Sequence, residues 1–260
     1  MADEMILSER DNDVLVLTLN RPERLNAAPP ALFDALREAL GALDGARAVL
    51  IQGAGRAFCS GADIGDARFA GGDPGEATHR ALTEHYNPTL LAIAELDVPV
   101  VSAVRGAAAG IGCSLALAAD FCVASDTGYF LQAFVNIGLV PDGGASWMLP
   151  RLIGRARAAE MMMLGERVPA HQAREWGMVH RVVSDEQLDH EALALAHQLA
   201  AGPTAALGMI RRGLARALDG SYAEALALEA THQRSARGTQ DAMEGVTAFL
   251  QKRPPRFTGN

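Results

Sequence analysis

The sequence has few of the side chains that favour nucleic acids or anionic membranes. Lys252 is the only lysine among the 260 residues, and 31 acidic side chains outnumber 23 basic ones, so the net charge is −8. An acidic chain with so little lysine is a poor partner for phosphate-rich surfaces. We therefore expect neither nucleic acid nor a membrane as a partner.

Cysteines and long apolar runs are also scarce. Cys59, Cys113 and Cys122 lie in apolar surroundings without metal-ligand spacing, so we expect reduced core residues and no metal site. The longest uncharged apolar run, residues 106–119, is shorter than the roughly 20 residues of a membrane helix and predicts a buried helix. The acidic N-terminus lacks the features of a secretory signal, which favours a cytoplasmic protein.

Strand and helix patterns alternate along the first two thirds of the chain. Because parallel neighbours need a crossover connection, this order predicts an α/β fold with parallel strands. The expected elements are strands at 14–19, 48–52 and 98–104, a helix at 31–43, a loop at 65–79 and a helix at 80–95.

From residue 189 onward the chain consists of segments rich in Ala and Leu at helical spacing, without a convincing strand. We therefore divide the chain into a core of residues 1–195 and a helical region of residues 196–260.

One glycine-rich segment, GAGRAF at residues 53–58, follows an expected strand and could suggest a dinucleotide-binding loop. That motif needs a third glycine where Phe58 stands, and no helix is expected to begin there. The segment therefore does not indicate a nucleotide cofactor.

Five longer stretches are more informative: NRPERLNA at 20–27, RAFCSGADI at 56–64, VRGAAAGIGCSL at 104–115, NIGLVPDGG at 136–144 and EGVTAFLQKRP at 244–254. Together, and in this order, they resemble the crotonase, or enoyl-CoA hydratase/isomerase, family over nearly the whole chain. The resemblance implies a crotonase-like spiral of ββα units. It also implies that the C-terminal helical region forms homotrimers or dimers of trimers.

The resemblance assigns two backbone amides, those of Ala62 and Ile111, to an oxyanion hole for the oxygen of an acyl thioester. Preorganised N–H donors stabilise enolate charge, each by about 3 kcal/mol. Ile111 stands where the family usually has glycine, which keeps the N–H and adds bulk. Another interpretation stays open, in which Gly106, Gly110 and Gly112 only permit close helix packing.

The acids of the site separate the chemistries of the family. Ser114 and Phe134 occupy the positions of the two glutamates used by a hydratase, so both acids are missing. Asp142 remains, at the place where enoyl-CoA isomerases carry their base, and residues 132–151 look most similar to ring-epoxide isomerases of the family. One carboxylate suffices for isomerisation, because it can take a proton from one carbon and return it to another.

Asp142 has two possible roles. Apolar neighbours such as Phe134, Leu139 and Trp147 would raise its pKa by desolvation and make it a better base. It could instead be a turn residue, since Pro-Asp-Gly is a common turn sequence.

The resemblance also implies residues that contact substrate. A neighbouring subunit is expected to add Phe249 and Lys252. Those expected within one chain are Arg24, Leu25, Ala62, Asp63, Ile64, Gly110, Ser114 and Phe134.

Several polar residues have plainer interpretations. Asp63 and Asp120 could cap or orient helix ends, and Ser114 could bond substrate, water or its own backbone. For the polar residues in or near the expected loop, we favour solvated surface roles over contact with the acyl group; they are Asp66, His79, His85 and Tyr86.

The leading hypothesis is an acyl-CoA isomerase that moves a double bond or rearranges a ring, with coenzyme A as part of the substrate and no separate cofactor. The alternatives are a hydratase or another lyase or hydrolase of the family. Outside enzymes, the alternative is an inactive acyl-CoA-binding or scaffold protein.

Overall fold

The computed structural model describes residues 4–65 and 73–260. Within them, six strands form the main sheet in the order β1-β2-β3-β4-β6-β9. β1 and β2 are antiparallel, and every later neighbour is parallel. The strands are β1 Ile6–Asp11, β2 Val14–Leu19, β3 Ala48–Gly53, β4 Val100–Val104, β6 Phe121–Ser125 and β9 Arg181–Val183. The predicted α/β class is confirmed.

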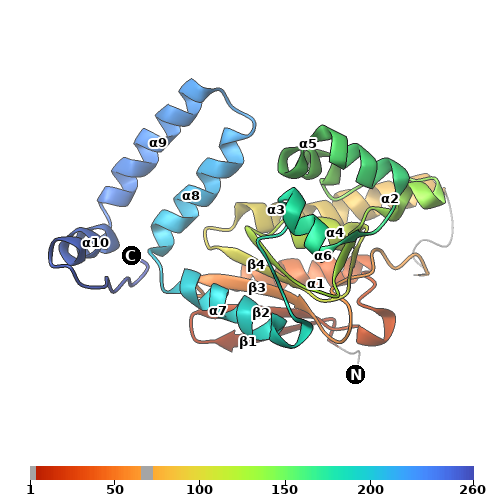
Figure 1. Ribbon diagram of the computed structural model, residues 1–260, viewed down its shortest axis with the longest axis horizontal. Coiled ribbons are helices and arrows are strands. Elements are labelled where there is room, and N and C mark those ends of the chain that lie inside the picture. Colours follow the sequence, from red (N-terminus) through yellow and green to blue (C-terminus); the bar gives the residue numbers. More distant parts are fainter. Residues whose placement is uncertain (1–3, 66–72) are drawn as a thin grey trace.

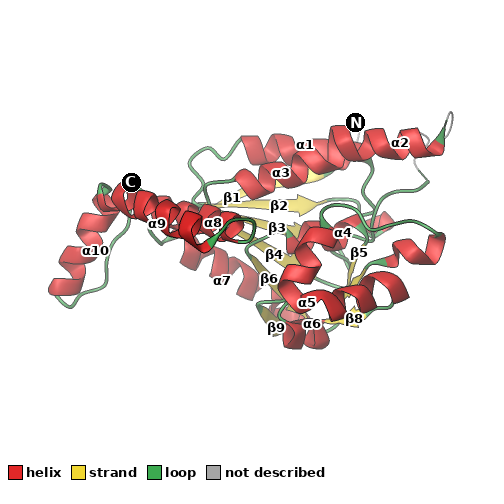
Figure 2. Cartoon of the chain, turned by 90° about the horizontal axis from the view of Figure 1, so that it is seen from above, coloured by secondary structure: helices red, strands yellow, loops and turns green. Residues whose placement is uncertain are grey.

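Both faces of the sheet are covered, which is why its strands are apolar on consecutive positions. Leu15 and Leu17 of β2 pack with α1 Pro30–Gly41 on one face, whereas Val14 and Val16 pack with α7 Leu188–Ala200 on the other. Figure 2 shows α1 and α3 on one side of the strands and α7 on the opposite side.

A smaller sheet lies beside the first and holds β5 Ala107–Ala109, β7 Tyr129–Leu131 and β8 Val168–Pro169. The apolar run at 106–119, expected to be one buried helix, is therefore β5, a turn at Gly110 and α4 Ile111–Leu117. The prediction was wrong because the alanines pair with β7, and Gly110 adopts φ +54°, which ends the strand and admits the helix.

The segment after β3 is helical earlier than expected. The predicted loop at 65–79 ends at Asp73, whose carboxylate accepts the amides of Gly75 and Glu76 and begins α2 Pro74–Ala81. A π-helical turn, Leu82–Tyr86, and α3 Asn87–Glu95 follow. Residues 66–72 of the predicted loop, including Asp66, lie outside the described residues.

The remaining helices of the core are α5 Ala145–Leu164 and α6 Ala170–Trp176. Three more helices, α8 Thr204–Ala217, α9 Tyr222–Arg237 and α10 Gln240–Leu250, extend beyond the sheet as an arm (Figure 1). The described chain contains no strand after residue 189, as predicted.

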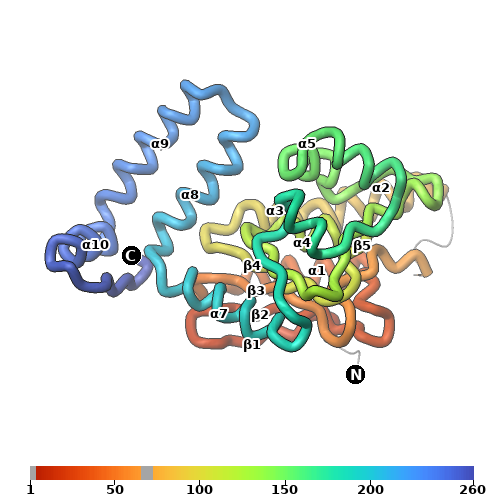
Figure 3. The backbone as a smooth tube through the Cα atoms, viewed as in Figure 1, coloured from red at the N-terminus to blue at the C-terminus, as the bar shows by residue number. Residues whose placement is uncertain are grey.

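The division at residue 195 falls inside α7, which packs on the sheet to Ala200. The tube in Figure 3 turns away from the core after this helix. In the described part of the chain, no single helix is long and apolar enough to cross a membrane. One bent pair, residues 185–200 with 204–217 at 106°, meets the length and composition required.

Arg47 ties the arm to the core. Its guanidinium donates to the carbonyl of Gly202 at 2.6 Å, to the hydroxyl of Thr204 at 2.9 Å and to the carbonyl of Phe257 at 3.3 Å. These acceptors lie on the α7–α8 connection and on the C-terminal segment, so one side chain anchors both.

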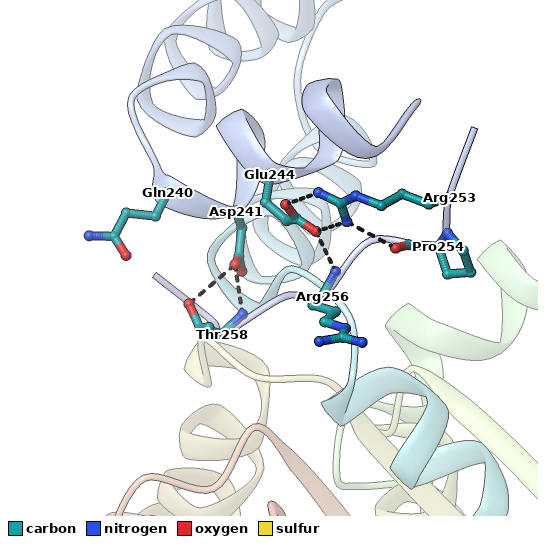
Figure 4. Close-up of a pocket in the computed structure, with 7 residues that line it drawn as sticks. All are labelled: Gln240, Asp241, Glu244, Arg253, Pro254, Arg256 and Thr258. Atoms are coloured by element: carbon teal, nitrogen blue, oxygen red, sulfur yellow. Dashed lines mark hydrogen bonds and ion pairs between the residues drawn. The ribbon is translucent and has the colours of Figure 1, made fainter. Parts of the chain in front are cut away.

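The C-terminal segment is also held against α10, as Figure 4 shows. Arg253 forms a bidentate pair with Glu244 at 2.6 and 2.8 Å, and this pair holds the pKa of Glu244 down to about 2. Asp241 accepts the amides of Thr258 at 2.7 Å and Gly259 at 2.8 Å. These bonds hold the orientation of α10 relative to the end of the chain.

Candidate active site

The glycine-rich segments at 59–62 and 107–111 run side by side. Cys59 donates to the carbonyl of Ala107 at 2.9 Å and accepts from the amide of Ala109 at 2.9 Å. Gly61 and Gly110 are so close that a Cβ on Gly110 would lie 3.7 Å from the Cα of Gly61. This approach brings together the two residues that follow these glycines.

Ala62 and Ile111 each present an uncommitted amide. Ala28 donates to the carbonyl of Gly61 at 2.8 Å and accepts from the amide of Asp63 at 3.1 Å. These two bonds lie on either side of Ala62 and do not involve the N–H of Ala62. Ile111 is the first residue of α4, where an amide has no acceptor within the helix. Among residues 4–65 and 73–260, neither N–H has a hydrogen-bond acceptor.

The glycines of this turn also have the packing role left open above. A Cβ on Gly106 would lie 2.2 Å from the carbonyl of Arg56, and one on Gly112 would lie 2.5 Å from the carbonyl of Cys59. Gly110 differs, since its nearest side chain is Phe134, whose ring would lie 3.6 Å from an added Cβ. Packing therefore requires Gly106 and Gly112, while Phe134 covers the turn at Gly110.

Asp142 lies between η4, Ala133–Ile137, and α5, on top of the first turn of α4. A Cβ on the next residue, Gly143, would lie 2.5 Å from Cδ1 of Ile111 and 2.7 Å from Cβ of Ser114. The structure therefore places Asp142 next to the residue that carries one of the two uncommitted amides.

The carboxylate of Asp142 is partly buried and unpaired. Its Oδ1 is inaccessible, and neither oxygen has a hydrogen-bond partner within the described part of the chain. Burial alone raises its pKa from 3.8 to about 6, because no charged neighbour offsets the loss of water. A turn aspartate would bond nearby amides through its carboxylate. Here it is the carbonyl that bonds, accepting the amide of Ala145 at 3.1 Å.

Leu139 and Trp147 were expected among the apolar neighbours of Asp142. Leu139 is half exposed. Trp147 donates its indole N–H to Asp219 at 3.3 Å, and the guanidinium of Arg151 lies 4.2 Å from its ring centroid. The indole is therefore engaged with the tip of the α8–α9 connection.

Ser114 is fully buried, and its hydroxyl donates to the carbonyl of Asp142 at 3.0 Å. Its donor is therefore bound to a neighbouring loop rather than to its own helix, and the expected contact with substrate stays a prediction. A helix side chain at this depth meets the neighbouring loop, which periodicity within the helix does not reveal.

The residues proposed to hold coenzyme A form the edge of the site. Leu25 lies in a left-handed turn at φ +53°, and its carbonyl accepts the amide of Ser60 at 3.0 Å. Arg24 and Ile64 are exposed, the latter by 78%. The Leu25–Ser60 bond brings the RLN turn against the 59–64 segment, and the role of these residues in binding coenzyme A stays a prediction.

Asp63 binds neighbouring arginines, at 2.9 Å to Arg21 and 3.4 Å to Arg24. Burial works against its ionisation, but the hydrogen bond from Arg21 and the charges of both arginines lower its pKa below 3.8. This carboxylate orients the turn, in agreement with its plainer interpretation.

Asp120 was expected at a helix end. It instead accepts Arg211 at 2.7 Å and the amide of Val100 at 2.8 Å, which anchors α8 to β4.

Phe249 and Lys252 do not join the site within one chain. Phe249 is 82% exposed on α10, and Figures 1 and 2 both place this helix at the opposite end of the molecule from α4 and α5. A second chain would have to bring them to the substrate.

Two residues that support the site were not assigned from the sequence. Asn26 is fully buried and bonds Arg21, Ala54 and Ala57, which fixes the turn before Ala28. Tyr86, expected at the surface, is buried and donates to the carbonyl of Ala28 at 2.8 Å. The only available signal was an asparagine within an apolar context, because contacts between distant segments leave no local pattern.

The other residues near the expected loop have surface or ion-pair roles. His79 is exposed, and His85 lies 2.7 Å from Asp34. All three cysteines are buried and free, as predicted, and burial raises their pKa values to between about 11 and 12.

Comparison with known proteins identifies the family of this chain. Residues 9–260 match the family model for enoyl-CoA hydratase/isomerase, and the chain belongs to that family. It is 43% identical to 1,2-epoxyphenylacetyl-CoA isomerase of Escherichia coli strain K12, over 98% of this chain and 99% of that protein. It is also 43% identical to a protein of Rhodobacter capsulatus named "Probable enoyl-CoA hydratase", with both chains fully covered.

Solved structures agree with the fold. A crystal structure of enoyl-CoA hydratase from Mycobacterium smegmatis superposes with a TM-score of 0.91 at 35% identity, over 97% of this chain and 98% of that chain. These matches establish that the chain has the crotonase fold and is an enzyme of this acyl-CoA-processing family. The relatives carry both isomerase and hydratase names, so they leave the choice of reaction to the chemistry of the site.

Proposed function

We propose that this protein is an acyl-CoA isomerase, in which the amides of Ala62 and Ile111 hold the thioester oxygen and Asp142 moves the proton. The observation that carries the proposal is the single unpaired, partly buried carboxylate of Asp142 beside the first turn of α4. By the resemblance, Ser114 and Phe134 stand where a hydratase has its two acids, and neither side chain has a carboxyl group.

In the proposed reaction, Asp142 removes a proton from the α-carbon of a 3-enoyl thioester or from the γ-carbon of a 2-enoyl thioester, and the C–H electron pair delocalises onto the carbonyl oxygen as a dienolate. The two amides stabilise the resulting enolate. The enolate then reforms the carbonyl as a different carbon takes the proton back from Asp142. The sum moves one proton and one double bond, so no oxidant, reductant or metal is required.

A base with a pKa of about 6 suits this exchange near neutral pH, because it is ionised before the first transfer and still able to give the proton back. Water addition would need a second group to activate water. No side chain among the described residues forms a hydrogen bond with the carboxylate of Asp142, so none is placed to share that work.

The test supplies the purified protein with a 2-enoyl-CoA and, separately, with a 3-enoyl-CoA. We expect interconversion of the two double-bond positions, lost by at least about 100-fold in Asp142→Asn. Asp126→Asn, a surface aspartate outside the site, is the control and should retain full activity. Rapid hydration of the 2-enoyl-CoA, unaffected by Asp142→Asn, would reject the isomerase in favour of a hydratase. Acyl-CoA binding without either reaction would favour the non-catalytic alternative.

We further propose that the arm assembles the protein into a homotrimer or a dimer of trimers, in which Phe249 and Lys252 reach the coenzyme A of a neighbouring subunit. Support comes from large apolar side chains that are exposed on the arm, namely Ile210, Leu214, Leu218, Tyr222, Leu226, Met243, Val246, Phe249 and Leu250. Sedimentation equilibrium should give a mass of three or six chains, and Leu214→Glu should lower it. A monomeric wild-type protein would reject this proposal.

A further inference from the structure

One hydrogen bond connects the base to the helix that carries an oxyanion donor. The hydroxyl of Ser114 donates to the carbonyl of Asp142 at 3.0 Å, across 28 positions of sequence. Ser114 is inaccessible to solvent and lies in α4, one turn after Ile111. The bond therefore joins the backbone of Asp142 to the first turn of α4.

The surrounding contacts leave the Asp142 turn little freedom. Gly143 has φ +60° and packs so closely on Ile111 and Ser114 that a Cβ there would come within 2.7 Å of both side chains. The carbonyl of Asp142 also accepts the amide of Ala145 at the start of α5. Its carboxylate makes no hydrogen bond within the described part of the chain, so the hydrogen bonds that hold this residue are made by its backbone.

We propose that Ser114 is a positioning residue, which holds the Asp142 carboxylate at a fixed place relative to the Ile111 amide by binding the Asp142 carbonyl. This inference rests on the proposed function, because it requires Asp142 to be the base. Ser114 itself takes part in no chemical step. Proton transfer depends steeply on the separation and direction of base and substrate, and misplacement of a group by about 1 Å can cost about 100-fold in rate.

A serine suits this role for a physical reason. Its hydroxyl is a short donor that reaches the carbonyl while remaining buried beneath the turn. An ionised carboxylate at the same position would have no proton to donate to the carbonyl, and its charge would disfavour the ionised form of Asp142. By the resemblance, Ser114 stands where a hydratase has one of its acids. The serine therefore replaces that acid and also provides the hydrogen bond that holds Asp142.

The experiment compares Ser114→Ala, which removes the hydroxyl, with Ser114→Cys, which keeps most of the volume but donates weakly. Ser102→Ala is the matched control, because Ser102 is equally buried and donates at 2.8 Å to the carbonyl of Ala116, at the other end of α4. All three proteins are assayed for 3-enoyl-CoA isomerisation over pH 4.5–9, and their urea midpoints are measured.

We expect both Ser114 variants to lose about 10- to 100-fold in kcat with KM changed less than about threefold, because positioning acts on the transfer step rather than on binding. Ser102→Ala should keep the wild-type kcat. The acid limb of the pH profile should also move below the wild-type value near pH 6 in the Ser114 variants, because a loosened turn lets water reach the carboxylate.

Any one of the following results would overturn the inference. Ser114→Cys with wild-type kcat would show that only volume matters, and equal losses in Ser102→Ala would show a general effect of destabilising α4. An acid limb of the pH profile that stays at its wild-type position would show that Ser114 does not influence Asp142. The proposed function fails separately, if Asp142→Asn in the wild-type background leaves isomerisation intact.

Discussion

Replacing Asp142 by asparagine should stabilise the folded protein while it removes the proposed base. Burial raises the pKa of Asp142 from 3.8 to about 6, so the folded state disfavours the ionised carboxylate. For a raised carboxyl pKa, the favourable contribution is present below the unfolded value and is lost as pH rises through the folded value. At pH 8 the loss is complete, and the difference corresponds to about 3 kcal/mol at about 1.4 kcal/mol for each pH unit.

The magnitude should depend on pH in a defined way. At pH 5, between the two pKa values, the carboxylate costs about 1.5 kcal/mol, because the folded form is largely protonated there. The amide of Asp142→Asn does not titrate, so any cost of burying it is the same at both pH values. The gain in unfolding free energy from the substitution should therefore be about 1.5 kcal/mol larger at pH 8 than at pH 5.

Urea unfolding of wild type and Asp142→Asn at pH 5, 6.5 and 8, at one protein concentration, measures this difference. The substitution Asp126→Asn, at an exposed aspartate outside the site, serves as the control. Parallel stability curves for wild type and Asp142→Asn across this range would refute the burial of the charge, whatever the enzymatic result.

Two further predictions concern packing and the arm. Gly112→Ala should lower the unfolding free energy by about 2 kcal/mol or more, because its Cβ would meet the Cys59 carbonyl at 2.5 Å. Gly41→Ala, whose Cβ meets nothing within 4 Å, should be neutral or slightly stabilising. Equal urea midpoints for the two variants would contradict this reasoning. Arg47→Ala removes three hydrogen bonds at the base of the arm and should cost about 2 kcal/mol, with faster amide hydrogen exchange at residues 253–260. Unchanged exchange there would mean that Glu244 and its neighbours hold that segment without the core.

Much of the fold was predictable because its signals are local. Residues 14–19 were predictable as a strand, since a short run of β-branched and leucine side chains that ends in a turn sequence favours a buried strand. The helical character after residue 189 follows in the same way from Ala and Leu at helical spacing. The prediction failed at residues 106–119, where alanine suits both states and pairing with β7 decides between them.

The candidate site was also predictable only where its signals are local. The motifs were enough to select Ala62, Ile111 and Asp142, because each is marked by neighbours in its own short phrase. They did not reveal that Ser114 binds Asp142, or that Tyr86 supports Ala28, since these pairs join positions far apart in the chain. No local periodicity records such a contact.

The sequence by itself determined the class of fold, which depends on residue type and spacing along the chain, and its resemblance to the family predicted Asp142 as the one candidate base. Tertiary structure alone decided that the Asp142 carboxylate is partly buried without a hydrogen-bond partner among the described residues, and that its turn rests on the first turn of α4. Burial and distance arise only when segments from different parts of the chain pack together, and they determine the pKa and the position of the base.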